Sequence, residues 1–327
     1  MTVPVAPQLI SPPRLRPGAT VGIVAPAGPV LPDRLRRGLA CLGDAFRLRI
    51  ADSVTAPHPP DTPSYLAASD DVRAAELTAM LADPDVRAIV LARGGYGIMR
   101  ILPRLDPDLL RRDPKPIVGF SDATALLAWT HHAGVRAIHG PVIAQLADLP
   151  PSDTAHLIRV LTDPAPLGER PWPLRVADGA PDGAVGKLRH HGPLIPANLS
   201  LAAFLIGTPW QLPLDGAIAL FEEIGEKPYA IDRYLTQLTL AGALAGTCAA
   251  VIGDLTRCHD PKPPNGAPDP DGAALAVMIE RLHAAAIPVV SGAPIGHGAR
   301  NEAIPFGARC ELDLSRGSLA ILDAAVA

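Results

Sequence analysis

Short apolar runs alternate with helix-forming stretches through the first half of this chain. Apolar runs with the length of a buried strand occupy residues 20–25, 86–92, 116–119 and 135–139. Between the first two, Ser69 is a candidate N-cap for a helix that ends at the Asp83-Pro84 pair. Strands separated by helices predict a parallel sheet with both faces covered and with ligands bound at the carboxyl ends of its strands.

The second half of the chain mixes strand and helix patterns and predicts a second α/β domain with a mixed sheet. We expect strands at residues 217–221, 248–253, 288–291, 308–314 and 318–322. We expect helices near residues 198–206, 231–240 and 271–285. A Pro- and Asp-rich stretch without periodicity separates the halves. We therefore predict an N-terminal domain over residues 1–165, a linker over 166–183 and a C-terminal domain over 184–327.

Charge and composition exclude two classes of partner. The formal net charge is −4, and the chain has no block of Lys or Arg that could bind along the phosphate backbone of a nucleic acid. Aromatic residues, which stack on bases in nucleic-acid-binding proteins, make up only 4%. The uncharged stretches at residues 193–214 and 238–253 are broken by proline or glycine and do not fit a membrane span. Residues 1–17 lack the apolar segment of a signal peptide. We expect a cytoplasmic protein that binds neither nucleic acid nor membranes.

The cysteines indicate neither disulfides nor a metal site. The four cysteines are Cys41, Cys248, Cys258 and Cys310. Their scattered spacing is typical of free thiols in a reducing compartment. Cys258-His259-Asp260 brings three ligand types together, but adjacent residues rarely chelate one ion, and no second ligand cluster is evident. We expect no metal and no cofactor.

A serine follows the third predicted strand on what reads as a sharp strand-to-helix turn. Gly119 and Ala123 stand two positions on either side of Ser121, where such a bend requires small residues. A serine at this junction is exposed at the positive end of a helix. The strict G-x-S-x-G pattern is not met, and the plainer interpretation of Ser121 as an N-cap stays open.

An acid and a histidine follow in the order found in α/β-hydrolases. Glu222 and Glu223 end an apolar run, and strand alternation turns only one of them inward. His297 lies between Gly296 and Gly298, which leave a histidine free to swing into place. The acids also fit an ordinary loop, and His297 a solvated turn. A serine activated by a histidine that an acid orients is the arrangement of nucleophilic catalysis.

Motifs spread along nearly the whole chain carry a family resemblance. They are residues 15–26 (LRPGATVGIVAP), 93–97 (RGGYG), 119–122 (GFSD), 198–200 (NLS), 206–209 (IGTP), 221–223 (FEE), 226–233 (EKPYAIDR), 294–298 (PIGHG), Asn301 and 305–307 (PFG). Together they resemble the LD-carboxypeptidases, serine peptidases that include muramoyltetrapeptide carboxypeptidase and the microcin C self-immunity peptidase. One departure is Pro196-Ala197, where the family often has two glycines near the substrate groove.

The resemblance implies a flavodoxin-like N-terminal domain with a nucleophile elbow, and a C-terminal domain that carries the acid and the histidine. By motif, it makes Ser121 the nucleophile, Glu222 the acid and His297 the base. It implies hydrolysis of an LD peptide bond through an acyl-enzyme, with release of terminal D-alanine from murein tetrapeptide in peptidoglycan recycling. Because family members are often dimers, we expect a homodimer that acts on a small peptide.

Such a reaction also needs two N–H donors for the oxyanion. Asp122 follows the serine directly and offers one from the first turn of its helix. We expect Gly95 to offer the other, because a glycine-rich loop at a strand end lets the backbone approach a substrate closely. Gly94 and Gly95 also suit a phosphate, but no G-x-G-x-x-G or G-K-[ST] pattern follows them.

Two other functions stay open at this point. A microcin C-type self-immunity peptidase, which cleaves acyl-adenylate or aminoacyl conjugates, is favoured if an extra aromatic residue lies in the groove. Trp172 and Trp210 are the candidates downstream of the serine. A non-catalytic peptide-binding module on the same scaffold is disfavoured, because competent residues fill all three catalytic positions.

Overall fold

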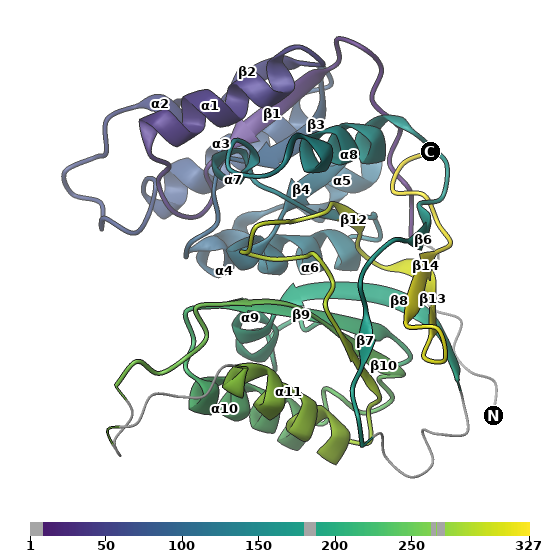
Figure 1. Cartoon of the computed structure of the whole chain (residues 1–327). Helices are drawn as coiled ribbons and strands as arrows, with labels where there is room; N and C mark the ends of the chain where they lie inside the picture. Colours follow the sequence, from purple (N-terminus) through teal and green to yellow (C-terminus); the bar gives the residue numbers. More distant parts are fainter. Residues whose placement is uncertain (1–8, 180–187, 263–265, 267–271) are drawn as a thin grey trace.

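A six-stranded sheet, parallel except at one edge, organises the first half of the computed structural model, which describes residues 9–179, 188–262, 266 and 272–327 (Figure 1). Its strands lie in the order β2 (Arg47–Ile50), β1 (Thr20–Val24), β3 (Val86–Leu91), β4 (Ile117–Gly119), β5 (Ile138–His139) and β12 (Ile304–Pro305). β12 pairs antiparallel with β5. The order β2-β1-β3-β4-β5 is one of the two common orders of doubly wound sheets. The parallel sheet predicted from the sequence is confirmed.

Helices cover both faces of this sheet, which explains why its central strands are apolar and buried. The helices are α1 (Pro32–Gly43), α2 (Asp52–Thr55), α3 (Asp70–Ala82), α4 (Ile98–Ile101), α5 (Pro107–Arg112), α6 (Thr124–His132), α7 (Ile143–Leu146) and α8 (Pro151–Thr162), with 3₁₀ turns η1 (Leu102–Arg104) and η2 (Ser121–Ala123). α1 packs on α7 and α8, whereas α3 to α6 pack on one another. Ser69 is the predicted N-cap of α3, because its hydroxyl accepts a hydrogen bond from the Val72 N–H at 3.3 Å.

The second half forms a curled sheet of eight strands (Figure 1). Their order is β6 (Gly168–Arg170), β14 (Ser318–Ile321), β13 (Ala308–Asp313), β8 (Arg189–Asn198), β9 (Ile218–Ile224), β10 (Ala249–Thr256), β11 (Val289–Ser291) and β7 (Arg175–Val176). The central strands β8 to β11 are parallel and the outer ones antiparallel. The predicted mixed sheet is confirmed. Helices α9 (Leu199–Phe204), α10 (Pro228–Leu240) and α11 (Ala273–Ala284) pack together beside it. Within the described ranges, no helix has the length and apolar character needed to cross a bilayer.

The sequence did not predict the central strand β8. Pro193 and Pro196 lie within it, and proline is rare inside central strands because it donates no hydrogen bond. Strands β6 and β7 lie within residues 166–183, the range predicted as a linker. The boundary predicted between residues 183 and 184 lies outside the described residues, and the domain limits stay a prediction.

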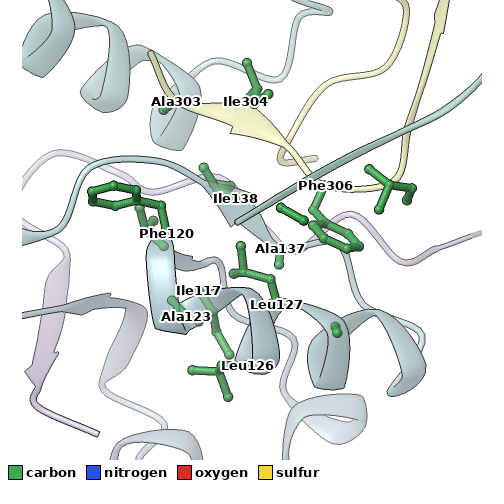
Figure 2. Close-up of a cluster of buried hydrophobic side chains, with 14 of the residues drawn as sticks. Ile117, Phe120, Ala123, Leu126, Leu127, Ala137, Ile138, Ala303, Ile304 and Phe306 are labelled. Atoms are coloured by element: carbon green, nitrogen blue, oxygen red, sulfur yellow. The ribbon is translucent and has the colours of Figure 1, made fainter. Parts of the chain in front are cut away.

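One segment of the second half returns to the first sheet. After β11 the chain adds β12 to the edge of the first sheet, where Ile304 pairs with His139, and then re-enters the second sheet as β13. Figure 2 shows Ile304 and Phe306 of this segment in one apolar cluster with Ile138 and Leu127, and all four side chains are buried. Because an apolar core spans both halves here, the two sheets are packed together rather than joined only by the covalent chain.

The close packing of α1 on α7 gives a stability test. A Cβ built on Gly38 of α1 would lie 1.9 Å from the carbonyl oxygen of Ile143 at the start of α7. Gly38→Ala therefore forces the helices apart, and we expect a loss of about 1–3 kcal/mol, measured as a lower Tm.

Gly43→Ala, in the last turn of the same helix, is the matched control. A Cβ at Gly43 meets no atom within 4 Å. Because alanine is the better helix former, this variant is expected to gain up to about 1 kcal/mol in unfolding free energy. Its Tm is therefore expected to stay the same or to rise. Equal Tm changes for both variants would contradict the close approach of α1 and α7.

Candidate active site

Ser121 stands on a strained turn between β4 and α6. Its φ angle is 64°, in the left-handed region that side chains rarely adopt. The turn is tight, because a Cβ built on Gly119 would lie 2.7 Å from the Cβ of Ala123. The predicted need for small residues at these two positions is thus explained by direct contact. The loop after β3 also passes close by, because a Cβ on Gly94 would lie 3.2 Å from the Ser121 hydroxyl oxygen.

Glu222 and His297 form a short polar contact. The Glu222 carboxylate, near the end of β9, is fully buried at 0% exposure, and its Oε2 lies 2.6 Å from Nδ1 of His297. The His297 side chain is 15% exposed. Gly296 permits this approach, since its φ is 130° and a Cβ there would lie 2.9 Å from Oε2 of Glu222. A residue larger than glycine before His297 would therefore displace the imidazole from the acid.

Ser121 and His297 line one cavity of about 500 Å³. The ring of Phe120 also lines it and lies 4.6 Å from the imidazole of His297 between ring centroids. Within the described ranges, no hydrogen bond joins the Ser121 hydroxyl to His297. In free enzymes such bonds are often long and tighten only when substrate binds. The fold thus brings Ser121 and His297 together, with Glu222 behind the imidazole.

Glu223 has a different role from its neighbour. Its carboxylate accepts hydrogen bonds from the Asn198 amide at 2.9 Å and from the backbone N–H groups of Ser200 and Ile224, each at 2.8 Å. Burial raises the pKa of Glu223 above its ordinary value. These bonds fix the junction of β8 with α9. Strand alternation left the choice between the two acids open, and the structure places Glu222 on the side of His297.

The two predicted oxyanion donors flank Ser121. Gly95 lines the cavity with a φ of 114°, and Asp122 lies in the 3₁₀ turn η2 that leads into α6. Across the described part of the chain, neither backbone N–H donates a hydrogen bond to a protein group. Gly95 thus presents a free N–H at the cavity, whereas Asp122 is buried and is not among the lining residues.

Two buried side chains hold the glycine-rich loop against the serine turn. The Asp122 carboxylate accepts a hydrogen bond from the Ile98 N–H at 2.9 Å, directly after this loop. The buried Arg73 guanidinium donates to the Gly97 carbonyl at 3.1 Å and to the Pro26 carbonyl. Burial raises the pKa of Asp122 to about 6, although the Ile98 bond and the charge of Arg73 oppose the shift.

The loop that carries His297 is held by Asn301, which belongs to the family motifs, and by Gln145 and Asp254, which the sequence did not single out. Gln145, just before the end of α7, donates to the Gly296 carbonyl at 3.0 Å and accepts from the Asn301 amide at 2.9 Å. Asn301 also accepts from the Gly296 N–H at 3.1 Å. Asp254 accepts from the Gly298 N–H at 3.1 Å on the opposite side of His297. These contacts fix the loop from both halves of the molecule.

Other candidate residues do not assemble a metal site. Among the described residues, no group of three or more His, Cys, Asp and Glu side chains is arranged to hold a metal ion. All four cysteines are free thiols. Asp260, the last residue of the Cys258-His259-Asp260 run, instead forms an ion pair with Lys227 at 3.2 Å.

Sequence comparison finds one family over both halves of the chain. The LD-carboxypeptidase N-terminal domain matches residues 21–140, and the LD-carboxypeptidase C-terminal domain matches residues 191–312. The chain is 36% identical to a Streptomyces coelicolor protein with a provisional carboxypeptidase name, over 96% of both chains. It is 31% identical to the murein tetrapeptide carboxypeptidase of Pseudomonas aeruginosa, over 90% of this chain and 94% of that protein.

Solved structures share this architecture. The muramoyltetrapeptide carboxypeptidase of Oxalobacter formigenes superposes with a TM-score of 0.76 at 29% identity, over 93% of this chain and 99% of its own. The microcin C7 self-immunity protein MccF, in complex with glutamyl sulfamoyl guanosine, superposes with a TM-score of 0.82 at 22% identity, over 98% of this chain and 100% of its own. The latter similarity shows a common fold.

The burial of Asp122 predicts a pH-dependent cost to stability. Because its pKa in the folded state, about 6, lies above the ordinary value of 3.8, the folded chain loses stability as pH rises between these values. Two pKa units correspond to about 3 kcal/mol as an upper limit. Asp122→Asn removes this cost and keeps an acceptor for the Ile98 N–H. We expect a higher unfolding free energy than the parent at pH 7.5 and a smaller advantage at pH 4.5, measured by urea denaturation. The same difference at both pH values would contradict the buried, titrating carboxylate.

Proposed function

This chain belongs to the LD-carboxypeptidase family of serine-type hydrolases, and we propose that it releases the terminal D-alanine of murein tetrapeptide. The observation that carries the proposal is the Glu222–His297 contact of 2.6 Å at the cavity that Ser121 lines. A serine and a histidine that line one cavity, with an acid bonded to the histidine, are the parts of an acyl-transfer site.

Each of the three side chains has one task in the proposed reaction. Ser121 Oγ attacks the carbonyl carbon of the residue before D-alanine while His297 Nε2 takes the hydroxyl proton. Glu222 accepts a hydrogen bond from the Nδ1–H of His297, and this bond fixes the tautomer and stabilises the imidazolium. The strained φ of Ser121 matches the nucleophile elbow implied by the resemblance.

The oxyanion and the leaving group complete the cycle. The free N–H groups of Gly95 and Asp122 donate to the oxyanion of the tetrahedral intermediate. His297 returns its proton to the departing amine of D-alanine, leaving an acyl-enzyme on Ser121. Water that His297 deprotonates then hydrolyses the ester and restores the free serine.

The choice of substrate is supported by the relatives and by the cavity. The Pseudomonas and Oxalobacter relatives are named for carboxypeptidase action on murein or muramoyl tetrapeptide. The rival, cleavage of acyl-adenylate conjugates, called for an extra aromatic residue in the groove. Trp172 is buried and donates its indole N–H to Glu302 at 3.0 Å, and neither it nor Trp210 is among the residues that line the cavity.

The setting of the reaction extends the proposal. We place it in the cytoplasm, in peptidoglycan recycling, and we propose a homodimer in which residues 1–165 and 184–327 are separate domains. The family resemblance supports the recycling role, the homodimer and the division into two domains, whereas the domain limits rest on the Pro- and Asp-rich stretch between the halves.

Removal of the nucleophile is the first test. Ser121→Ala is expected to lower kcat on murein tetrapeptide by about 1,000-fold or more, with unchanged circular dichroism. Mass spectrometry of tetrapeptide, tripeptide and a microcin-type conjugate measures which substrate the parent consumes. Tetrapeptide cleavage by the purified variant at the parental rate would refute Ser121 as the nucleophile.

The neighbouring acids give a second test with opposite expected results. Glu222→Gln removes the negative charge that stabilises the imidazolium and allows an amide NH2 to face Nδ1, so it is expected to lower kcat by about 1,000- to 10,000-fold. Glu223→Gln places an amide against donor N–H groups and is expected to cost about 1–3 kcal/mol in stability, with kcat within about tenfold of the parent. The measurements are kcat and Tm. A larger kcat loss for Glu223→Gln than for Glu222→Gln would reverse the assignment.

A further inference from the structure

The cavity at Ser121 is electropositive. Of the 13 described residues that line it, three are arginines and none is acidic. Glu222 is buried behind His297 and does not line the cavity. A cavity with cations and no carboxylates favours a ligand that brings a negative charge.

The three arginines differ in whether they are already engaged. Arg34 forms an ion pair with Asp148, so its charge is compensated. Arg93 donates to the Pro29 carbonyl at 2.7 Å. The Arg257 guanidinium makes no hydrogen bond and no ion pair within the described ranges, and the residue is exposed. Arg257 is thus the arginine of the cavity with all its donors free for a ligand.

The backbone at Arg257 is strained as it is at Ser121. In the described part of the chain, the non-glycine residues with positive φ are Ser121 at 64°, Arg257 at 56° and Ala286 at 59°. Ala286 follows the end of α11, where a left-handed residue commonly terminates a helix. The other two line the same cavity. Strained residues persist only where the surrounding structure holds them, and they cluster at active sites and ligand-binding sites.

Neighbouring residues at the carboxyl end of a parallel strand hold the left-handed backbone conformation of Arg257. Arg257 directly follows β10, and the carbonyl of Thr256 accepts a hydrogen bond from the Gly225 N–H at 2.9 Å. Thr256 and Ile224, from the adjacent ends of β10 and β9, line the cavity beside it. The ends of two neighbouring strands therefore present the guanidinium to the site.

We propose that Arg257 binds the free carboxylate of the substrate's terminal residue, an inference that rests on the proposed carboxypeptidase function. In such a substrate the terminal carboxyl carbon lies three bonds from the scissile carbonyl carbon, a distance of about 3–4 Å. A carboxypeptidase therefore needs its carboxylate-binding cation in the same cavity as its nucleophile. The guanidinium of Arg257 suits this task because it donates two parallel hydrogen bonds to one carboxylate.

A comparison of acid and amide substrates tests the proposal. The parent and Arg257→Ala are each assayed on murein tetrapeptide and on the same peptide with a C-terminal amide. For the parent, amidation is expected to lower kcat/KM by about 10- to 100-fold, the range for hydrogen bonds to charged groups. Arg257→Ala is expected to lose about the same factor on the acid and to treat the two peptides alike. Arg257→Lys, which keeps the charge, is expected to recover part of the preference for the acid.

Two further variants separate Arg257 from other cations. Arg93→Ala is expected to keep the preference for the acid. Arg47→Ala removes an exposed arginine of β2 that makes no ion pair in the described ranges, and it is expected to match the parent throughout. Retained preference in Arg257→Ala, or its loss in Arg93→Ala instead, overturns the assignment to Arg257. No tetrapeptide cleavage by the parent overturns the proposed function as well.

A stability measurement tests the backbone part of the inference. Arg257→Gly removes the guanidinium and relaxes the left-handed backbone, so it is expected to lose the preference for the acid while its Tm rises by about 2–4 °C. An unchanged or lower Tm would contradict the claim that the left-handed backbone at Arg257 lowers the stability of the folded protein.

Discussion

The buried carboxylate of Glu222 is the constraint around which the site is arranged. A charge removed from water is costly unless it has a partner, and the ring of His297 supplies that partner at 2.6 Å. The approach depends on Gly296, where any side chain would collide with the acid. It also depends on Gln145 of the first half of the chain, which donates to the Gly296 carbonyl, and on Asn301, which bonds both Gln145 and the Gly296 N–H. The contact therefore couples the geometry of the site to the packing of the two sheets.

Both sheets contribute to the cavity through the carboxyl ends of parallel strands. Ser121 follows β4 of the first sheet, whereas Arg257 follows β10 of the second. The β12 segment and its buried core hold these ends in one place. Because β12 belongs to the first sheet but follows His297 in sequence, the histidine is anchored on both sides. The fold thus brings together residues more than 100 positions apart without a metal or a disulfide among the described residues.

Local features could be predicted from the sequence, and long-range ones could not. The turn at Ser121 was visible because the small residues it needs, Gly119 and Ala123, are its near neighbours. The choice between Glu222 and Glu223 stayed open until the family resemblance selected one. Alternation shows that neighbouring strand residues face opposite sides of the sheet, but not which of the two faces the site. Strand β8 was missed because its prolines are typical of loops. The contacts of Gln145 and the left-handed backbone of Arg257 depend on tertiary packing and leave no local pattern.

The most direct measurement of the central claim is labelling with a serine-directed phosphonate, followed by peptide mass mapping. If Ser121, His297 and Glu222 act as one unit, the parent carries a single label at Ser121. Labelling of His297→Ala is then slower by orders of magnitude, because the hydroxyl lacks its base. A parent without label at Ser121, or equal labelling rates in the parent and His297→Ala, would contradict the assembly of these side chains into one catalytic unit.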